Sequence, residues 1–123
     1  MKTLLLVEDN EDNRDMLARR LRRKGYRVET AVNGKEALDM LQDIRPDLVL
    51  MDLSMPVMDG WEATRRIKQD PGLRDIPVVV LTGHAMKEDR EKALSVGADG
   101  YIPKPIDMQA LLTCLNDLLE NAP

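Results

Sequence analysis

Short apolar runs alternate along this chain with longer segments in which apolar residues recur at helical spacing. Three runs, at 4–7, 48–51 and 78–81, are apolar throughout, which is typical of strands buried on both faces of a sheet. Residues 27–31 alternate between polar and apolar, which indicates an edge strand. We therefore predict five strands, at residues 3–7, 27–31, 48–51, 78–82 and 100–102.

The segments between these strands have the period of amphipathic helices. We predict helices at residues 12–24, 34–44, 60–69, 87–96 and 107–120, and Gly25, Gly72 and Gly97 lie at or shortly after three helix ends. This strand–helix alternation predicts an α/β fold with a doubly wound parallel sheet between two layers of helices. In such sheets a ligand site forms beyond the carboxyl ends of the strands, which makes the residues just after each strand the first candidates for a site.

Composition limits the classes of protein to consider. A chain of 123 residues that is 43% hydrophobic fits one domain spanning 1–123. Its net charge of −4 argues against direct binding to nucleic acid, and its first apolar run is too short for a signal peptide or membrane span. We therefore expect a cytoplasmic protein that does not enter a membrane, and we see no linker to a further domain. The basic run at 19–24 indicates a solvated helix face or a docking surface for an acidic partner.

Polar residues follow four of the five predicted strands. Glu8 and Asp9 follow the first, Asp52 follows the third, Thr82 ends the fourth and Lys104 follows the fifth. Because the carboxyl ends of parallel strands meet at one edge, we expect these side chains to gather there. Glu8 and Asp9 would point to opposite faces within a regular strand, so both can serve one site only if the strand ends near residue 7.

Three gathered carboxylates repel one another, and either protonation or a bound cation relieves the repulsion. Oxygen ligands without Cys or His favour a hard ion, and Mg²⁺ fits better than Ca²⁺ because no segment has calcium-loop spacing. Such a site suits phosphoryl transfer. Asp52 is the candidate nucleophile, since it ends a buried central strand, while Lys104 and the Thr82 hydroxyl could bind phosphoryl oxygens.

At these residues the sequence resembles the receiver domains of bacterial two-component response regulators, in particular single-domain proteins similar to chemotaxis regulators. The resemblance covers essentially the whole chain. It rests on five fragments in order: Val7-Glu8-Asp9-Asn10 with Asn13-Arg14; Asn33-Gly34-Lys35-Glu36-Ala37-Leu38; Met51-Asp52-Leu53-Ser54-Met55-Pro56-Val57-Met58-Asp59-Gly60; Leu81-Thr82-Gly83-His84-Ala85; and Gly97-Ala98-Asp99-Gly100-Tyr101-Ile102-Pro103-Lys104-Pro105.

The resemblance implies a flavodoxin-like receiver fold with five helices and strand order 2-1-3-4-5. It implies that Asp52 accepts a phosphoryl group from a histidine kinase or histidine phosphotransfer protein, and that an unidentified partner reads the change. Asp9, Asp52 and the backbone carbonyl of Ser54 would hold Mg²⁺, with Glu8 acting directly or through water. Any catalysis would be limited to phosphorylation and dephosphorylation of the protein's own aspartate.

The resemblance also assigns a switch pair and two modulators. Thr82 and Tyr101 match the family's switch residues, in which the hydroxyl moves to the phosphoryl group and the ring turns inward. Ser54 and His84 occupy positions that tune the lifetime of the phosphoryl group. The step from Lys104 to Pro105 corresponds to a cis peptide in the family.

Two surfaces follow from the same comparison. One side of the first predicted helix, beside the acidic site, would contact the phosphodonor. The face made by the fourth helix, fifth strand and fifth helix would be the output surface, on a monomer or on a dimer that forms after phosphorylation. The first surface includes Met16, Arg20 and Arg23, and the second includes Lys87, Arg90, Glu91 and Tyr101.

The sequence is also compatible with three other interpretations. The chain could be the receiver portion of a hybrid kinase or of a DNA-binding regulator. A phosphatase of the haloacid dehalogenase type also uses a nucleophilic Asp with Mg²⁺, but it places a second acid two residues later, where this chain has Ser54. A flavodoxin-like cofactor binder would need a Ser/Thr/Gly-rich phosphate loop after the first strand, where residues 8–12 are mostly acidic.

Overall fold

The computed structural model describes residues 1–53, 59–83 and 87–120, with residues 87–89 described through their backbone alone. Ser54 and His84 therefore lie outside the described residues. Five strands form one parallel sheet in the order β2-β1-β3-β4-β5. The strands are β1 (Thr3–Val7), β2 (Arg27–Ala31), β3 (Leu48–Asp52), β4 (Val78–Thr82) and β5 (Gly100–Pro103). The α/β fold class, the strand order and the edge position of β2 are confirmed.

Five helices connect and follow the strands: α1 (Glu11–Arg23), α2 (Gly34–Met40), α3 (Gly60–Gln69), α4 (Lys87–Ser95) and α5 (Met108–Glu120). Most bounds lie within one residue of those predicted. The predicted end of α2 at residue 44 was wrong, because after Met40 the chain tightens into turns in which Gln42 N donates to Asp39 O. Pro46 follows shortly and disfavours a helical conformation at the residue before it.

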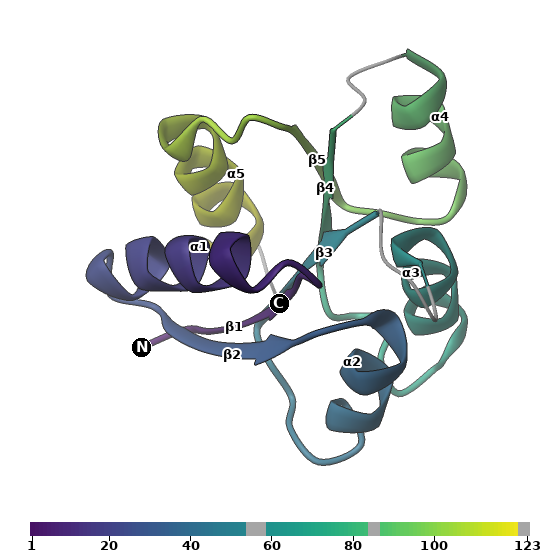
Figure 1. Ribbon diagram of the computed structural model, residues 1–123. Helices are drawn as coiled ribbons and strands as arrows, with labels where there is room; N and C mark the ends of the chain where they lie inside the picture. The colour runs from purple at the N-terminus through teal and green to yellow at the C-terminus, as the bar shows by residue number, and fades with distance from the viewer. Residues whose placement is uncertain (54–58, 84–86, 121–123) are drawn as a thin grey trace.

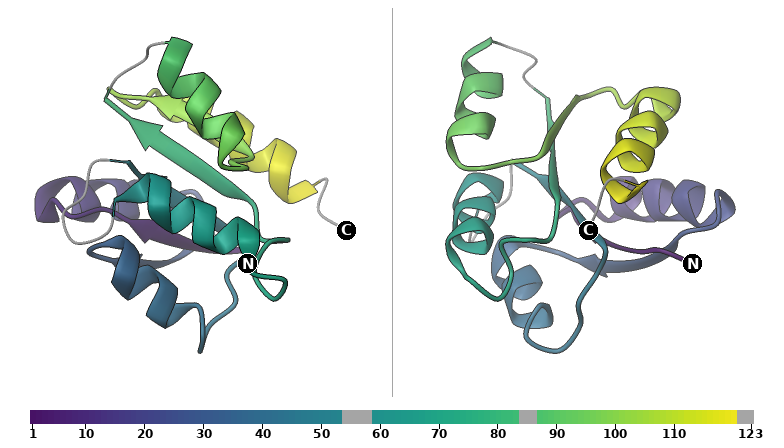
Figure 2. Two further views of the ribbon diagram at one scale, coloured as in Figure 1. Left: turned by 90° about the vertical axis from the view of Figure 1, so that its right-hand side faces the viewer. Right: turned by 180° about the vertical axis from the view of Figure 1, so that it is seen from behind.

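The sheet lies between two layers of helices, as Figures 1 and 2 show from three directions. Alternate residues of β1 face opposite layers: Leu4 and Leu6 pack with α1 and α5, whereas Leu5 and Val7 pack with α2, α3 and α4. The same alternation in β3 and β4 explains why these strands are apolar at consecutive positions. Among the described helices, none has the length and hydropathy that crossing a bilayer requires.

Candidate functional site

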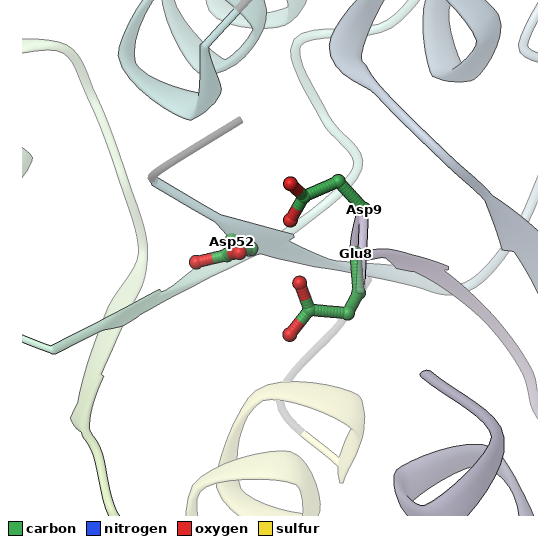
Figure 3. Close-up of side chains that lie close together, drawn as sticks. All are labelled: Glu8, Asp9 and Asp52. Atoms are coloured by element: carbon green, nitrogen blue, oxygen red, sulfur yellow. The ribbon is translucent and has the colours of Figure 1, made fainter. Parts of the chain in front are cut away.

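Three acidic side chains converge at the carboxyl end of the sheet. Glu8, Asp9 and Asp52 each offer a carboxylate oxygen, and these oxygens lie within 4.8 Å of one another. Figure 3 shows Glu8 and Asp9 approaching Asp52 from two sides. The structure therefore brings together the three carboxylates that the sequence placed after β1 and β3.

The end of β1 makes this convergence possible. β1 stops at Val7, the Glu8 N–H still donates to Ala31 O at 3.0 Å, and Asn10 already caps α1 by accepting from Asn13 N at 2.9 Å. The chain therefore leaves the sheet within three residues, and the geometric condition for both acids to serve one site is met. The Asn10 N–H also donates to Glu8 Oε2 at 3.3 Å, which orients the Glu8 carboxylate.

Asp52 is the last residue of β3 and is only 3% exposed. Its backbone is closely approached by the start of α3, because a Cβ built on Gly60 would lie 2.1 Å from Asp52 O and 2.7 Å from Leu53 Cα. Gly60 N also donates to Leu53 O at 3.3 Å. No side chain fits at position 60 without moving the backbone that carries Asp52.

Lys104 enters the site from the segment after β5. Its ammonium nitrogen lies 3.1 Å from Asp52 Oδ1 and 3.5 Å from Glu8 Oε1. The backbone N–H of Lys104 donates to the backbone carbonyl of Thr82 at 2.6 Å. The Lys104–Pro105 peptide is cis, in agreement with the resemblance. The ends of β1, β3, β4 and β5 are thus linked through one lysine.

The cluster holds more carboxylates than cations. Burial, together with a hydrogen bond and repulsion from Asp52, raises the pKa of Glu8 from 4.5 to about 7, although Lys104 opposes the shift. Burial lowers the pKa of Lys104, but its hydrogen bond to Asp52 and the negative charges of Asp52 and Glu8 outweigh burial and raise it above 10.5. Lys104 is therefore a permanent cation, and it is the one group in the described residues that forms ion pairs with this cluster.

The donor set fits a small hard cation. Three carboxylates within 4.8 Å, with no Cys or His among them, match the oxygen ligands that Mg²⁺ prefers, and partial exposure on the Asp9 side leaves room for the waters it retains. Glu8, Asp9 and Asp52 are the described residues that could hold such an ion. The fourth ligand implied by the resemblance, the carbonyl of Ser54, lies outside the described residues.

Thr82 and Tyr101 occupy neighbouring strands on the same face of the sheet. Tyr101 is in register with Val80, and Thr82 lies two residues further along β4, so both side chains are directed towards the layer of α2, α3 and α4. Thr82 is buried at the end of β4, while Tyr101 is half-buried and packs against that layer. Thr82 and Tyr101 therefore form a diagonal pair of side chains near the carboxyl end of the sheet, where Asp52 also lies.

A hollow of about 300 Å³ adjoins the acidic cluster on the side of α1 and α5. Met16 and Arg20 line it from α1, Pro105 and Met108 line it from the segment after β5 and the start of α5, and Glu8 and Lys104 are also among its lining residues. Arg23, which the sequence analysis grouped with Met16 and Arg20, lines a different hollow on the other flank of α1. The predicted phosphodonor surface is therefore divided, and only its Met16 and Arg20 portion reaches the site.

Sequence reasoning did not identify Gly60 as a residue that positions Asp52. The available signal was the order Asp59-Gly60 at the start of a helix, in which Asp59 caps α3 by accepting from Glu62 N at 2.9 Å. A glycine immediately after a capping residue suggests a close approach, but the partner of that approach depends on how α3 packs against β3.

Comparisons with known proteins agree with this fold. The model of the response regulator receiver domain matches residues 4–116. The polar-differentiation response regulator DivK of Brucella anthropi is 39% identical over 121 residues, which are 98% of each chain. The chemotaxis protein CheY4 of Vibrio cholerae is 34% identical with a TM-score of 0.90, covering 97% of this chain and 99% of that one.

A third relative bears on the metal. The receiver domain of the sensor histidine kinase PA1611 from Pseudomonas aeruginosa is 36% identical with a TM-score of 0.90, covers 98% of both chains, and has a magnesium ion coordinated in its active-site cleft. On the evidence of the family model, the relatives and the five-stranded sheet, this chain belongs to the response regulator receiver domain family of two-component signalling.

Proposed function

We propose that this protein is a Mg²⁺-dependent phosphorylation switch in which Asp52 accepts a phosphoryl group from a histidine kinase or a histidine phosphotransfer protein in the cytoplasm. The observation that supports it is the setting of Asp52, which is buried at a strand end, 3.1 Å from the Lys104 ammonium and beside Glu8 and Asp9. A fixed nucleophile with a permanent cation beside it is what transfer of a charged phosphoryl group requires.

The reaction exchanges one bond to phosphorus for another. A carboxylate oxygen of Asp52 attacks the phosphorus of a phosphohistidine, the O–P bond forms as the P–N bond breaks, and the imidazole nitrogen keeps the electron pair. Lys104, now 3.1 Å from Asp52, is placed to pair with a phosphoryl oxygen once the carboxylate has become an acyl phosphate. Bound Mg²⁺, held by Asp9 and Asp52 with Glu8 directly or through water, would neutralise charge on the phosphoryl oxygens.

We further propose that Thr82 and Tyr101 carry the phosphorylated state to a partner. Thr82 ends the strand beside Asp52, and Tyr101 lies diagonally across β5 on the same face. Movement of the Thr82 hydroxyl towards a phosphoryl oxygen would leave space for the Tyr101 ring. The ring would then alter the surface of α4, β5 and α5, where Arg90 and Glu91 are exposed.

The phosphodonor would approach through the hollow that adjoins the acidic cluster. Met16 and Met108 offer an apolar contact on its two sides, while Arg20 adds a cation at the rim. A donor helix seated there would place a phosphohistidine near Lys104 and Asp52. The roles that the resemblance implies for Ser54 and His84 as lifetime modulators remain part of this proposal.

The test uses a small-molecule phosphodonor, acetyl phosphate, with and without Mg²⁺. We expect the wild type to gain one phosphoryl group that is stable to acid and labile to base, as intact-protein mass spectrometry can show. Asp52→Asn should abolish the gain, whereas Asp43→Asn, which removes an exposed carboxylate in the turn after α2, should not change it. Labelling that persists in Asp52→Asn, or that never appears with Mg²⁺ present, would contradict the proposal.

A further inference from the structure

The second half of α1 and the start of β2 concentrate positive charge in a chain that is acidic elsewhere. Residues 19–27 contain six of the 18 basic residues and no Asp or Glu, which leaves 12 basic against 22 acidic residues in the rest of the chain. Figure 1 shows α1 lying beside β1 and β2 at one edge of the sheet. Of these six residues only Arg20 lines the hollow beside the acidic cluster.

Part of this charge surrounds a hollow of about 400 Å³, which we call the arginine hollow. It is lined by Asp15, Arg19, Arg22 and Arg23, residues that recur at helical steps along one flank of α1. Met16 and Arg20 lie on the other flank and line the hollow that adjoins the acidic cluster. The two flanks of one helix therefore offer two different surfaces.

The arginine hollow is partly organised in advance. Arg22 Nη2 donates to Val28 O at 2.8 Å. The backbone N–H of Arg27 donates to Lys2 O, and Ala31 O accepts from the backbone N–H of Glu8. The backbone groups of odd-numbered β2 residues therefore face β1, whereas the Val28 carbonyl faces away from the sheet. This contact holds the Arg22 guanidinium at the sheet edge and leaves further N–H donors available.

The positive charge in the hollow is not neutralised within the described residues. The ion pairs found in residues 1–53, 59–83 and 87–120 include none from Arg19, Arg22 or Arg23. Asp15 lines the hollow one turn before Arg19, but it is a single carboxylate beside three guanidinium groups. Arg19 and Arg23 are exposed and so can meet a ligand without rearrangement of the core.

We propose that the arginine hollow is a docking site for an acidic segment of a partner protein, whose Asp and Glu carboxylates pair with Arg19, Arg22 and Arg23. Guanidinium groups bind carboxylates through two parallel hydrogen bonds, which suits closely spaced acids in a peptide. A compact acidic segment can meet the arginines alone. An extended polyanion such as DNA, or a flat anionic membrane, would also meet the net negative surface of the rest of the chain.

The position of the hollow separates this docking from phosphorylation. α1 begins at Glu11 beside the acidic cluster and runs back to Arg23, after which β2 begins in register with Thr3 at the opposite end of β1. The arginine hollow therefore lies towards the amino end of the sheet. The acidic segment should bind equally well whether or not Asp52 carries a phosphoryl group.

The test measures binding of a fluorescein-labelled ten-residue poly-glutamate peptide by fluorescence anisotropy in low salt, with a poly-glutamine peptide as the neutral probe. The double variant Arg19→Glu/Arg23→Glu should bind the acidic peptide about tenfold more weakly than the wild type. The control, Lys35→Glu/Arg74→Glu, changes the net charge equally at exposed residues elsewhere and should lose less than about twofold. Arg22 is left in place because it contacts β2.

Binding that weakens with added salt and is unchanged in the phosphorylated protein or in Asp52→Asn would support the proposal, even if Asp52 proves not to be the phosphoacceptor. Equal losses in the two double variants would overturn it, since they would show attraction to net charge alone. Absence of binding to poly-glutamate would also overturn it. Tighter binding to a ten-nucleotide single-stranded DNA, or to phosphatidylserine vesicles, would replace it with a nucleic-acid or a membrane surface.

Discussion

The two ends of the sheet hold charged groups in opposite ways. At the amino end, Lys68 Nζ lies 2.6 Å from Asp99 Oδ2 and donates to Ile76 O at 2.8 Å and Arg74 O at 3.1 Å. The same Asp99 oxygen accepts from Val78 N at 2.9 Å. Each of the three ammonium protons therefore has an acceptor within the protein.

At the carboxyl end, three carboxylates gather, of which only Glu8 and Asp52 pair with the ammonium of Lys104, and the burial of Glu8 raises its pKa to about 7. Charges that hold the fold together are satisfied by the protein itself. The carboxylates at the other end of the sheet are left in excess over the one cation that pairs with them, and holding them close together costs stability. α3 connects these two ends of the sheet, because it begins at Gly60 beside Asp52 and contains Lys68 one residue before its last residue.

The largest expected effect comes from filling the contact between α3 and β3. In Gly60→Ala the new Cβ would lie 2.1 Å from Asp52 O, so helix and strand must separate. We expect a loss of about 3 kcal/mol in the free energy of unfolding, measured by urea denaturation, and slower phosphorylation of Asp52. Gly83→Ala is the matched control, because a Cβ at position 83 meets no atom of the described residues within 4 Å. Wild-type stability in Gly60→Ala would contradict the close contact between α3 and the backbone of Asp52.

The next effect concerns the excess negative charge itself. Because the pKa of Glu8 is about 7 in the folded protein against an ordinary value of 4.5, its protonated form stabilises the fold. That stability is fully present below pH 4.5 and is lost as the pH rises through 7. We expect the metal-free protein, in chelator, to lose up to about 3 kcal/mol across this window through this group.

Glu8→Gln should flatten this pH dependence and raise the metal-free stability at neutral pH, whereas Glu29→Gln, an exposed change on β2, should leave the curve unchanged. Added Mg²⁺ should stabilise the wild type most above pH 7, since an ion that binds the ionised cluster binds only the folded state. A stability curve that is the same for Glu8→Gln and wild type would refute the electrostatic interpretation of this end of the sheet.

The carboxyl end was predictable from sequence to a degree that the amino end was not. Asp52 and Lys104 lie within two residues of the ends of predicted strands, and parallel strands place such residues at one edge whatever the details of packing. Glu8 and Asp9 needed one further condition, namely that β1 ends at Val7, which the structure meets. The functional roles of these residues remain predictions until phosphorylation is measured.

The remaining features depend on contacts between segments that no local pattern encodes. Lys68 and Asp99 are 31 positions apart, and their pairing requires the end of α3 to lie against the start of β5. Gly60 belongs to a recognisable motif, yet its close approach to Asp52 O follows from helix-on-sheet packing. The division of α1 into two flanks likewise depends on which side faces α5 and which faces the edge of β2.

A smaller effect is expected from breaking the satisfied charges at the amino end. Lys68→Met keeps the aliphatic packing but leaves Asp99 and two carbonyl groups without the ammonium, and the Lys68 side chain is only 14% exposed. We expect a loss of about 2 kcal/mol in the free energy of unfolding. Lys35→Met, at an exposed position of α2, should cost little. Phosphorylation of Asp52 by acetyl phosphate should be unchanged, and a slower reaction would show that the two ends are coupled.

The smallest effect lies midway along α3, at a polar group that belongs to neither end. Thr64 is fully buried, and its Oγ1 has no hydrogen-bond partner among the residues that the structure describes. Thr64→Val removes the hydroxyl while keeping the shape and the β-branching, so helix propensity changes little. We expect a gain of about 1 kcal/mol in the free energy of unfolding, because an unsatisfied buried group is lost. Thr64→Ser, which keeps the hydroxyl and loses the methyl group, should instead be less stable than the wild type by about 1 kcal/mol. Destabilisation of Thr64→Val would show that the hydroxyl has a hydrogen-bond partner. The polar surroundings of Asp52 would then extend along α3 as far as Thr64.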